Sequence, residues 1–202
     1  MANTTFSGPV RSESGFQTVS KNATTGALTV TKTSGTGSSP TNMSPGAGIS
    51  NGTGTIHKTS VSQDGDLIVT KILMDITGLN CGGTAGDIIG VDGAGAAYIA
   101  QITAAVNGTV FAGEIKCFEA PTTGDPDIDV YAADEGTGVE DTAIGDLTET
   151  QLVNSGDLSL GSVDIFTAFP SADQYLYLVC GTATAGTYDA GKIEITLYGH
   201  AA

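Results

Sequence analysis

The chain has 202 residues, of which 29 are Gly, and its 7 Lys and Arg against 22 Asp and Glu give a formal net charge of −15. This length is enough to bury a sizeable core, whereas so few cations cannot neutralise many phosphates or hold the chain on anionic lipid. We therefore expect neither nucleic-acid binding nor membrane binding.

Charge and composition divide the chain near residue 60. Residues 1–60 carry four basic residues and one acid, whereas residues 61–202 carry three basic residues and 21 acids. The segment 34–54 is rich in Ser, Thr and Gly, a composition typical of a linker or an extended arm. We predict an N-terminal arm or edge strands over 1–60 and a β-rich body over 61–202. Two hypotheses stay open for the first part: edge strands with a long surface loop, or an arm that docks on another subunit.

The body begins with a hydrophobic period of two, which indicates strands. In residues 66–77, one face of the predicted strand carries Ile68, Ile72, Met74 and Ile76. The next β-rich stretch, 97–120, is interrupted by Asn107-Gly108, the strongest short hairpin signal because both turn positions need a positive φ. We therefore predict a hairpin at this dipeptide.

The later segments continue the strand pattern. Short strands are predicted in 127–133 and 162–169, followed by a C-terminal pair from 174–180 and 192–200. The last strand places Ile193, Ile195 and Leu197 inward, against Lys192, Glu194, Thr196 and Tyr198 outward. The best helical candidate, Thr142–Val153, is a short helix or a loop. The predicted fold is an all-β antiparallel β-sandwich or jelly roll with an extended N-terminal arm.

The cysteines and the N-terminus bear on the cellular compartment. Cys81, Cys117 and Cys180 are odd in number and far apart, so we predict no disulfide framework and place them as small core or interface residues. The sequence has no secretory signal and no apolar run long enough to span a membrane, so we expect synthesis in a host cytoplasm.

Motifs for catalysis are absent from the sequence. It contains no phosphate-binding P-loop, no dinucleotide fingerprint and no nucleophile elbow. The two histidines, His57 and His200, follow a Gly-rich tract and lie near the C-terminus, which suits a positioned base poorly. We expect no enzyme activity and no cofactor.

An acidic stretch is the one feature with a plausible small ligand. Between Glu119 and Asp164 there are twelve acids and no Lys or Arg. Asp125, Asp127 and Asp129 alternate, so their oxygens share one edge of an extended segment and are candidate ligands for Ca²⁺. The alternative is a solvated acidic face that confers solubility.

Two short segments carry a resemblance to a known family. The opening ANTTFSGPVRSESGF and the closing strand GKIEITLYGH resemble virion structural proteins of tailed bacteriophages, above all capsid decoration (cement) proteins. The resemblance implies a β-sandwich or jelly-roll body, often a homotrimer, on the outer surface of the virion capsid, where it bridges major capsid protein subunits and stabilises the shell.

From the resemblance and the charge division we predict that the arm docks on the major capsid protein through Phe6, Val10, Arg11 and Phe16. The alternative function is a head-fibre or tail-associated module that binds glycan or the host surface. Its mark would be a groove lined by tyrosines, for which Tyr175, Tyr177, Tyr188 and Tyr198 are candidates; the same residues could instead form a cross-strand ladder.

Overall fold

A computed structural model of the chain describes residues 16–21, 26, 28–34 and 43–201. Contacts divide the chain into two compact units, Met1–Ser39 and Pro40–Ala202. The first unit holds a two-stranded antiparallel sheet of β1 (Phe16–Lys21) and β2 (Leu28–Ser34). The division predicted near residue 60 therefore lies later than the one in the structure, because residues 43–60 belong to the larger unit.

Backbone contacts explain why part of the Gly-rich tract packs into the larger unit. The amide of Gly46 donates to Tyr98 O at 2.9 Å, and that of Gly48 donates to Ala96 O at 2.7 Å. A side chain at Gly48 would place its Cβ 2.6 Å from the carbonyl oxygen of Gly95, so only glycine allows this approach. The short helix α1 (Ala47–Ser50) then buries Ile49 completely. Glycine here serves close packing rather than a linker.

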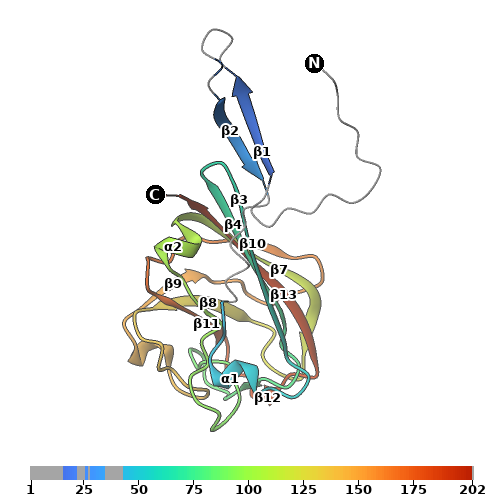
Figure 1. The fold of residues 1–202 in the computed structure, drawn as a ribbon. Coiled ribbons are helices and arrows are strands. Elements are labelled where there is room, and N and C mark those ends of the chain that lie inside the picture. The colour runs from blue at the N-terminus through green and yellow to red at the C-terminus, as the bar shows by residue number, and fades with distance from the viewer. Residues whose placement is uncertain (1–15, 22–25, 27, 35–42, 202) are drawn as a thin grey trace. The chain divides into compact units, whose positions relative to one another are not determined.

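The larger unit contains a five-stranded antiparallel sheet with the strand order β10-β7-β13-β4-β3 (Figure 1). Its members are β3 (Ile56–Asp64), β4 (Leu67–Asp75), β7 (Thr109–Thr122), β10 (Val163–Ile165) and β13 (Ala190–His200). The last strand, β13, lies between β7 and β4 and pairs with both along nearly its whole length. The C-terminal strand is therefore central to this sheet.

The predicted alternation of β4 and β13 is confirmed. On β4, Ile72 and Met74 are fully buried and Ile68 is 6% exposed. On β13 the side chains of Ile193, Ile195 and Leu197 are buried, as the sequence predicts. A strand pleat sends alternate side chains to opposite faces, so the order of apolar residues alone identifies the inner face.

A second antiparallel sheet has the order β6-β11-β8-β9. Its strands are β6 (Ala100–Gln101), β8 (Ile128–Ala133), β9 (Glu149–Val153) and β11 (Tyr175–Cys180). A two-residue pair, β5 (Asn80–Cys81) with β12 (Gly186–Thr187), forms a small sheet of its own. One buried cluster joins side chains of the two larger sheets, among them Ile72, Ile195, Val130 and Leu178. The all-β, antiparallel class is thus confirmed.

The hairpin predicted at Asn107-Gly108 is wrong. The preceding residues form a helical turn, α2 (Ala104–Asn107), and β7 starts only after Gly108. Asn107 is buried, accepts a hydrogen bond from Thr103 N at 2.9 Å and donates one to Thr70 Oγ1 at 2.9 Å. These contacts hold the asparagine in a helical turn, which the local dipeptide signal could not anticipate.

Two further sequence predictions are corrected. The segments 174–180 and 192–200 are strands but not partners, because β11 pairs with β6 and β8 whereas β13 pairs with β4 and β7. The helical candidate Thr142–Val153 holds a single 3₁₀ turn, η1 (Ile144–Asp146), followed by β9. Within the described ranges, none of the helices has the length and apolar character needed to cross a membrane.

Candidate functional site

The outer face of the five-stranded sheet, turned away from the buried cluster, carries the lysines of the larger unit. Lys58, Lys71, Lys116 and Lys192 are all the Lys and Arg residues in 40–202, and each lies on a strand of this sheet. Cross-strand register places two rows of side chains across all five strands: Lys58, Leu73, Glu194, Lys116, Val163 and Ser60, Lys71, Thr196, Glu114, Ile165. This surface is called the outer face below.

Acids on the same face neutralise the lysines. Lys116 Nζ lies 2.6 Å from Glu114 Oε1 and 3.8 Å from Glu194 Oε1, and Lys71 Nζ lies 3.5 Å from Glu194. Lys192 pairs with Glu119 and, at 3.6 Å, with Asp75. With Asp64 at the end of β3, the face has five acids against four lysines and a net charge of −1, out of −17 for residues 40–202.

Hydrogen bonds between the charged groups shift their protonation equilibria in the expected directions. The hydrogen bond from Lys116 lowers the pKa of Glu114, and the same bond raises the pKa of Lys116. Both side chains therefore remain charged at neutral pH. Pairs at this level of exposure contribute only about 0.2–1 kcal/mol each to folding, so they set the charge of the face more than the stability of the fold.

Large apolar side chains line the edge of the outer face along β7 and β10. The exposed fractions are 50% for Phe111, 50% for Phe118, 49% for Val163, 63% for Ile165 and 75% for Leu160. Val163 and Ile165 stand directly opposite Lys116 and Glu114. We call these five residues the apolar rim. Exposed apolar side chains on neighbouring strands and the adjoining turn are typical of interaction sites in soluble proteins.

Both phenylalanines of the apolar rim are the extra residues of β-bulges. Lys192 pairs with Glu119 and Ile193 with Cys117, so Phe118 has no partner on β13. The same occurs where Tyr198 pairs with Ala112 and Gly199 with Val110, which leaves out Phe111. A bulge re-aims the side chain of its additional residue. Phe111 thus owes its exposure to the register of the sheet, because its parity matches that of the buried Ile115 and Cys117, whereas Phe118 has the parity of the outward Glu114 and Lys116.

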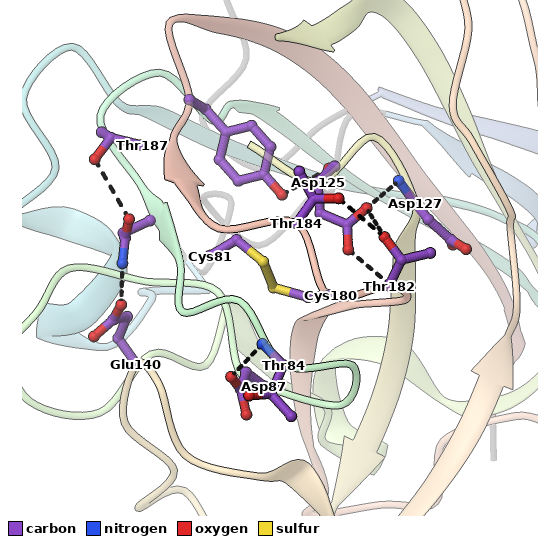
Figure 2. Close-up of a disulfide and its surroundings, with 12 residues drawn as sticks. Cys81, Thr84, Asp87, Asp125, Asp127, Glu140, Cys180, Thr182, Thr184 and Thr187 are labelled. Atoms are coloured by element: carbon purple, nitrogen blue, oxygen red, sulfur yellow. Dashed lines mark hydrogen bonds between the residues drawn. A yellow bond between two sulfur atoms is a disulfide. The ribbon is translucent and has the colours of Figure 1, made fainter. Parts of the chain in front are cut away.

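Two of the three carboxylates predicted as Ca²⁺ ligands, those of Asp125 and Asp129, accept hydrogen bonds from nearby backbone and side-chain groups. Asp125 is fully buried and accepts hydrogen bonds from Asp127 N at 3.1 Å, Thr182 N at 2.7 Å and Thr182 Oγ1 at 2.8 Å (Figure 2). Asp129 is 4% exposed and accepts from Gln151 Nε2 at 2.8 Å and Ser155 N at 3.0 Å. These hydrogen bonds therefore hold Asp125 beside Thr182, and Asp129 beside Ser155, which follows β9.

Asp127 is the member of this trio with an unsatisfied oxygen. Its Oδ1 is buried without a hydrogen-bond partner in the described part of the chain. Burial, with the charges of Asp129, Asp125 and Asp157 in support, raises the pKa of Asp127 to about 6. The folded state therefore disfavours the ionised form of Asp127, because its carboxylate is partly desolvated and lies near other negative charges.

The prediction that the cysteines form no disulfide is wrong. Cys81 at the end of β5 is bonded to Cys180 at the end of β11 across 99 residues, with a Cα–Cα distance of 6.2 Å (Figure 2). Cys117 is buried and free, as predicted for a core residue. A separation of 99 residues gives no sequence signal for pairing, because only the fold brings the two strand ends together.

Asp125 lies beside this disulfide. Among the residues that the structure describes, Cys81, Asp125 and Cys180 form one group whose potential metal-ligating atoms come within 4.8 Å of one another. The two sulfurs are bonded to each other, and the carboxylate already accepts three hydrogen bonds. In this oxidised form the group offers a metal no thiolate, so it acts as a structural staple.

The two histidines lie on β3 and β13, and the four candidate tyrosines are not gathered in one groove: Tyr175 packs edge-on against Tyr98, Tyr198 donates to Glu114 Oε1 on the outer face, and the other two are buried. His57 Nε2 is 2.8 Å from Ile99 O, and burial lowers the pKa of this imidazole. His200 is the last residue of β13. Tyr177 and Tyr188 are fully buried, and each hydroxyl donates to a backbone carbonyl, Tyr177 to Glu135 O and Tyr188 to Asp125 O. Neither ring can serve as a stacking platform for a sugar.

The predicted arm residues Phe6, Val10 and Arg11 lie outside the described residues, and Phe16 begins β1. Sequence reasoning did not single out the apolar rim. A partial signal was available for Phe118, whose parity is opposite to that of the buried Ile115 and Cys117, but Phe111 has their parity and turns outward only because of a bulge, which depends on the partner strand. Comparison of the chain with protein-family models, curated proteins and solved structures finds no match.

Proposed function

We propose that this chain is a structural protein of a tailed-phage virion, with a body of β-sandwich or jelly-roll type that binds the outer surface of the capsid. It bridges major capsid protein subunits and stabilises the shell. The observation that carries this proposal is the apolar rim on a face of nearly zero net charge, in a molecule that is otherwise strongly acidic.

The charge distribution supports one orientation on the capsid. A face with a net charge of −1 approaches another protein with little electrostatic cost, and the rim supplies apolar side chains that lose water on contact. Residues 120–157, by contrast, carry ten acids and no Lys or Arg. In the proposed complex the outer face meets the shell, whereas the acidic segment faces solvent and repels neighbouring particles.

Cosedimentation of the purified full-length chain with undecorated capsids tests the proposal. We expect saturable, stoichiometric binding by the wild type and a loss of affinity of about thirtyfold or more in the double variant Phe111→Ser, Phe118→Ser, because exposed aromatic anchors dominate such interfaces. Both side chains are half exposed, so the fold should persist, which circular dichroism checks.

Phe169→Ser is the matched control. Phe169 is 42% exposed and lies outside the apolar rim, so the same chemical change there should leave capsid binding unaltered. Absence of wild-type binding, or equal loss in the control and the double variant, would contradict the proposal. A reconstruction of the decorated capsid should place β7 and β10 against the shell.

A further inference from the structure

Strand β10 is an open edge of the five-stranded sheet. Cys117 N donates to Ser162 O at 3.0 Å, and Phe166 N donates to Gly113 O at 2.9 Å. In an antiparallel ladder these bonds come at alternate residues, so Asp164 is the residue that bonds to β7 between them. The backbone N–H and C=O groups of Val163 and Ile165 therefore point away from β7, and no partner for them occurs among the described residues.

The side chains along this edge have alternating chemistry. Val163 and Ile165 belong to the apolar rim on the outer face, whereas Asp164 stands opposite the buried Ile115 on the inner side. Asp164 is partly buried, and in the described part of the chain neither a hydrogen bond nor an ion pair links its carboxylate to another residue. The edge strand thus carries an acidic residue between two apolar residues, and the N–H and C=O groups of the apolar pair have no partner among the described residues.

We propose that β10 binds an extended strand of a partner protein by antiparallel strand addition, and that this strand reads apolar, basic, apolar. The inference rests on the proposed function, in that the strand belongs to the structural protein that the outer face contacts. Val163 and Ile165 form the hydrogen-bonded pairs with the added strand, and its apolar side chains extend the rim.

Asp164 selects the basic residue. It falls at a position without ladder hydrogen bonds to the added strand, where the facing Cα atoms are only about 4.5 Å apart and side chains lie closest. A Lys or Arg at that position pairs with a carboxylate that has no other partner, while an acid there is repelled. The net charge of −17 over residues 40–202 favours a basic strand at longer range as well.

The same geometry opposes a second copy of this chain as the occupant. Two-fold pairing of β10 with itself, centred on Asp164, would bring two carboxylates to about 4.5 Å Cα separation. Like charges directly opposite each other destabilise a strand pair. An inward-pointing charge on an edge strand is also a device that prevents edge-to-edge association of identical sheets. A basic strand from another protein can bond to the open backbone groups and pair with Asp164, whereas a second β10 would oppose two aspartates.

Titration of the ¹⁵N-labelled full-length chain with two peptides, acetyl-STVKVTS-amide and acetyl-STVEVTS-amide, tests the inference by amide chemical shifts. We expect the lysine peptide to shift the amides of Val163 and Ile165 and to bind at least about fivefold more tightly than the glutamate peptide. The charge-swap variant Asp164→Lys should reverse this order. Asp92→Lys, which makes the same change at an exposed turn residue, should leave it unaltered.

Each other outcome overturns the inference. Equal affinity for both peptides, shifts centred away from β10, no binding at millimolar peptide, or wild-type dimers formed through Val163 and Ile165 would each do so. These failures are separable from failure of the proposed function. If the peptides do not bind at β10 but Phe111→Ser, Phe118→Ser still loses capsid binding, the docking face stands and strand addition is wrong.

Discussion

The outer face of the five-stranded sheet and the acidic segment, residues 120–157, use carboxylates in opposite ways. On the outer face, Glu114 and Glu194 lie beside lysines on neighbouring strands, and the charges nearly cancel. In the acidic segment no Lys or Arg is present, and three of its carboxylates, those of Asp125, Asp129 and Glu135, accept backbone N–H groups instead. The outer face is thereby nearly neutral, as the proposed docking requires, whereas the acidic segment uses carboxylates to hold turns and keeps its net charge.

The acidic segment contains β8 and β9, and it uses these acceptors in the turns that lie outside the two strands. Asp125 accepts from Thr182 N, Asp129 from Ser155 N and Glu135 from Thr148 N at 2.8 Å. Each bond fixes a turn that no strand ladder holds. Acidity in this segment is therefore partly a means of folding, which is why an alternating row of aspartates need not indicate a cation site.

Among the changes considered, loss of the disulfide beside the acidic segment should lower the free energy of unfolding most. Cys180→Ala removes a cross-link over 99 residues that secures the end of β11 beside the acidic segment. We expect a loss of about 3–4 kcal/mol in the free energy of unfolding, measured by urea denaturation, because an open chain gains entropy when unfolded. Adding a reductant should destabilise the wild type similarly and leave Cys180→Ala unchanged. A variant as stable as the wild type would show that the bond carries no such role.

Asp125→Asn should have the next largest effect. The amide retains one acceptor oxygen, but its NH₂ group then faces either Thr182 N, which donates to Oδ2, or Asp127 N and Thr182 Oγ1, which donate to Oδ1. We expect a loss of about 2 kcal/mol, since buried donors left unsatisfied carry their full desolvation penalty. The matched control is Asp134→Asn, where an exposed carboxylate accepts from Gln174 Nε2 at 2.9 Å. An equal loss in both variants would refute the special role of burial.

Asp127→Asn should instead stabilise the protein at neutral pH. The pKa of Asp127 is raised from 3.8 to about 6 by burial and neighbouring aspartates, so the native state holds its proton more tightly than the unfolded chain does. Wild-type stability then falls as the pH rises from about 4 to about 6 and stays low above that range. Replacing the carboxyl should add about 1 kcal/mol at pH 7.5, allowing for solvent screening, and nothing at pH 3.5.

Urea denaturation at both pH values measures this difference. Asp92→Asn removes one negative charge at an exposed turn residue and controls for net charge alone. If the two variants respond to pH alike, the effect belongs to the overall charge of −15 rather than to the surroundings of Asp127.

The sequence predicts one of these regions far better than the other. On β4 and β13 the pleat translates the order of Ile72, Met74, Ile193 and Ile195 directly into an inner face, so the strands and the polar outer side follow from local pattern. The partners of β13 do not follow, because pairing is decided by distant parts of the chain. The central place of this strand therefore needed the structure.

The candidate sites were harder still to predict. The alternation of Asp127 and Asp129 holds through the start of β8, but Asp125 precedes the strand and turns toward Thr182. The exposure of Phe111 arises from a register shift against β13, and the Cys81–Cys180 bond from two strand ends 99 residues apart. All three features are set by tertiary contacts that no local pattern records.

The smallest expected effect concerns the outer face itself. Lys116→Gln removes the cation between Glu114 and Glu194, and we expect a loss of only about 0.5 kcal/mol at low salt that disappears near 1 M salt. Lys58→Gln is the control, since Lys58 is exposed and has no ion pair within the described residues. A loss above 2 kcal/mol that persists in salt would show that the ion pairs of the outer face are needed for the stability of the fold. The near-neutral charge of the outer face would then be explained by the stability of the fold. The contrast with the acidic segment would no longer support a docking face.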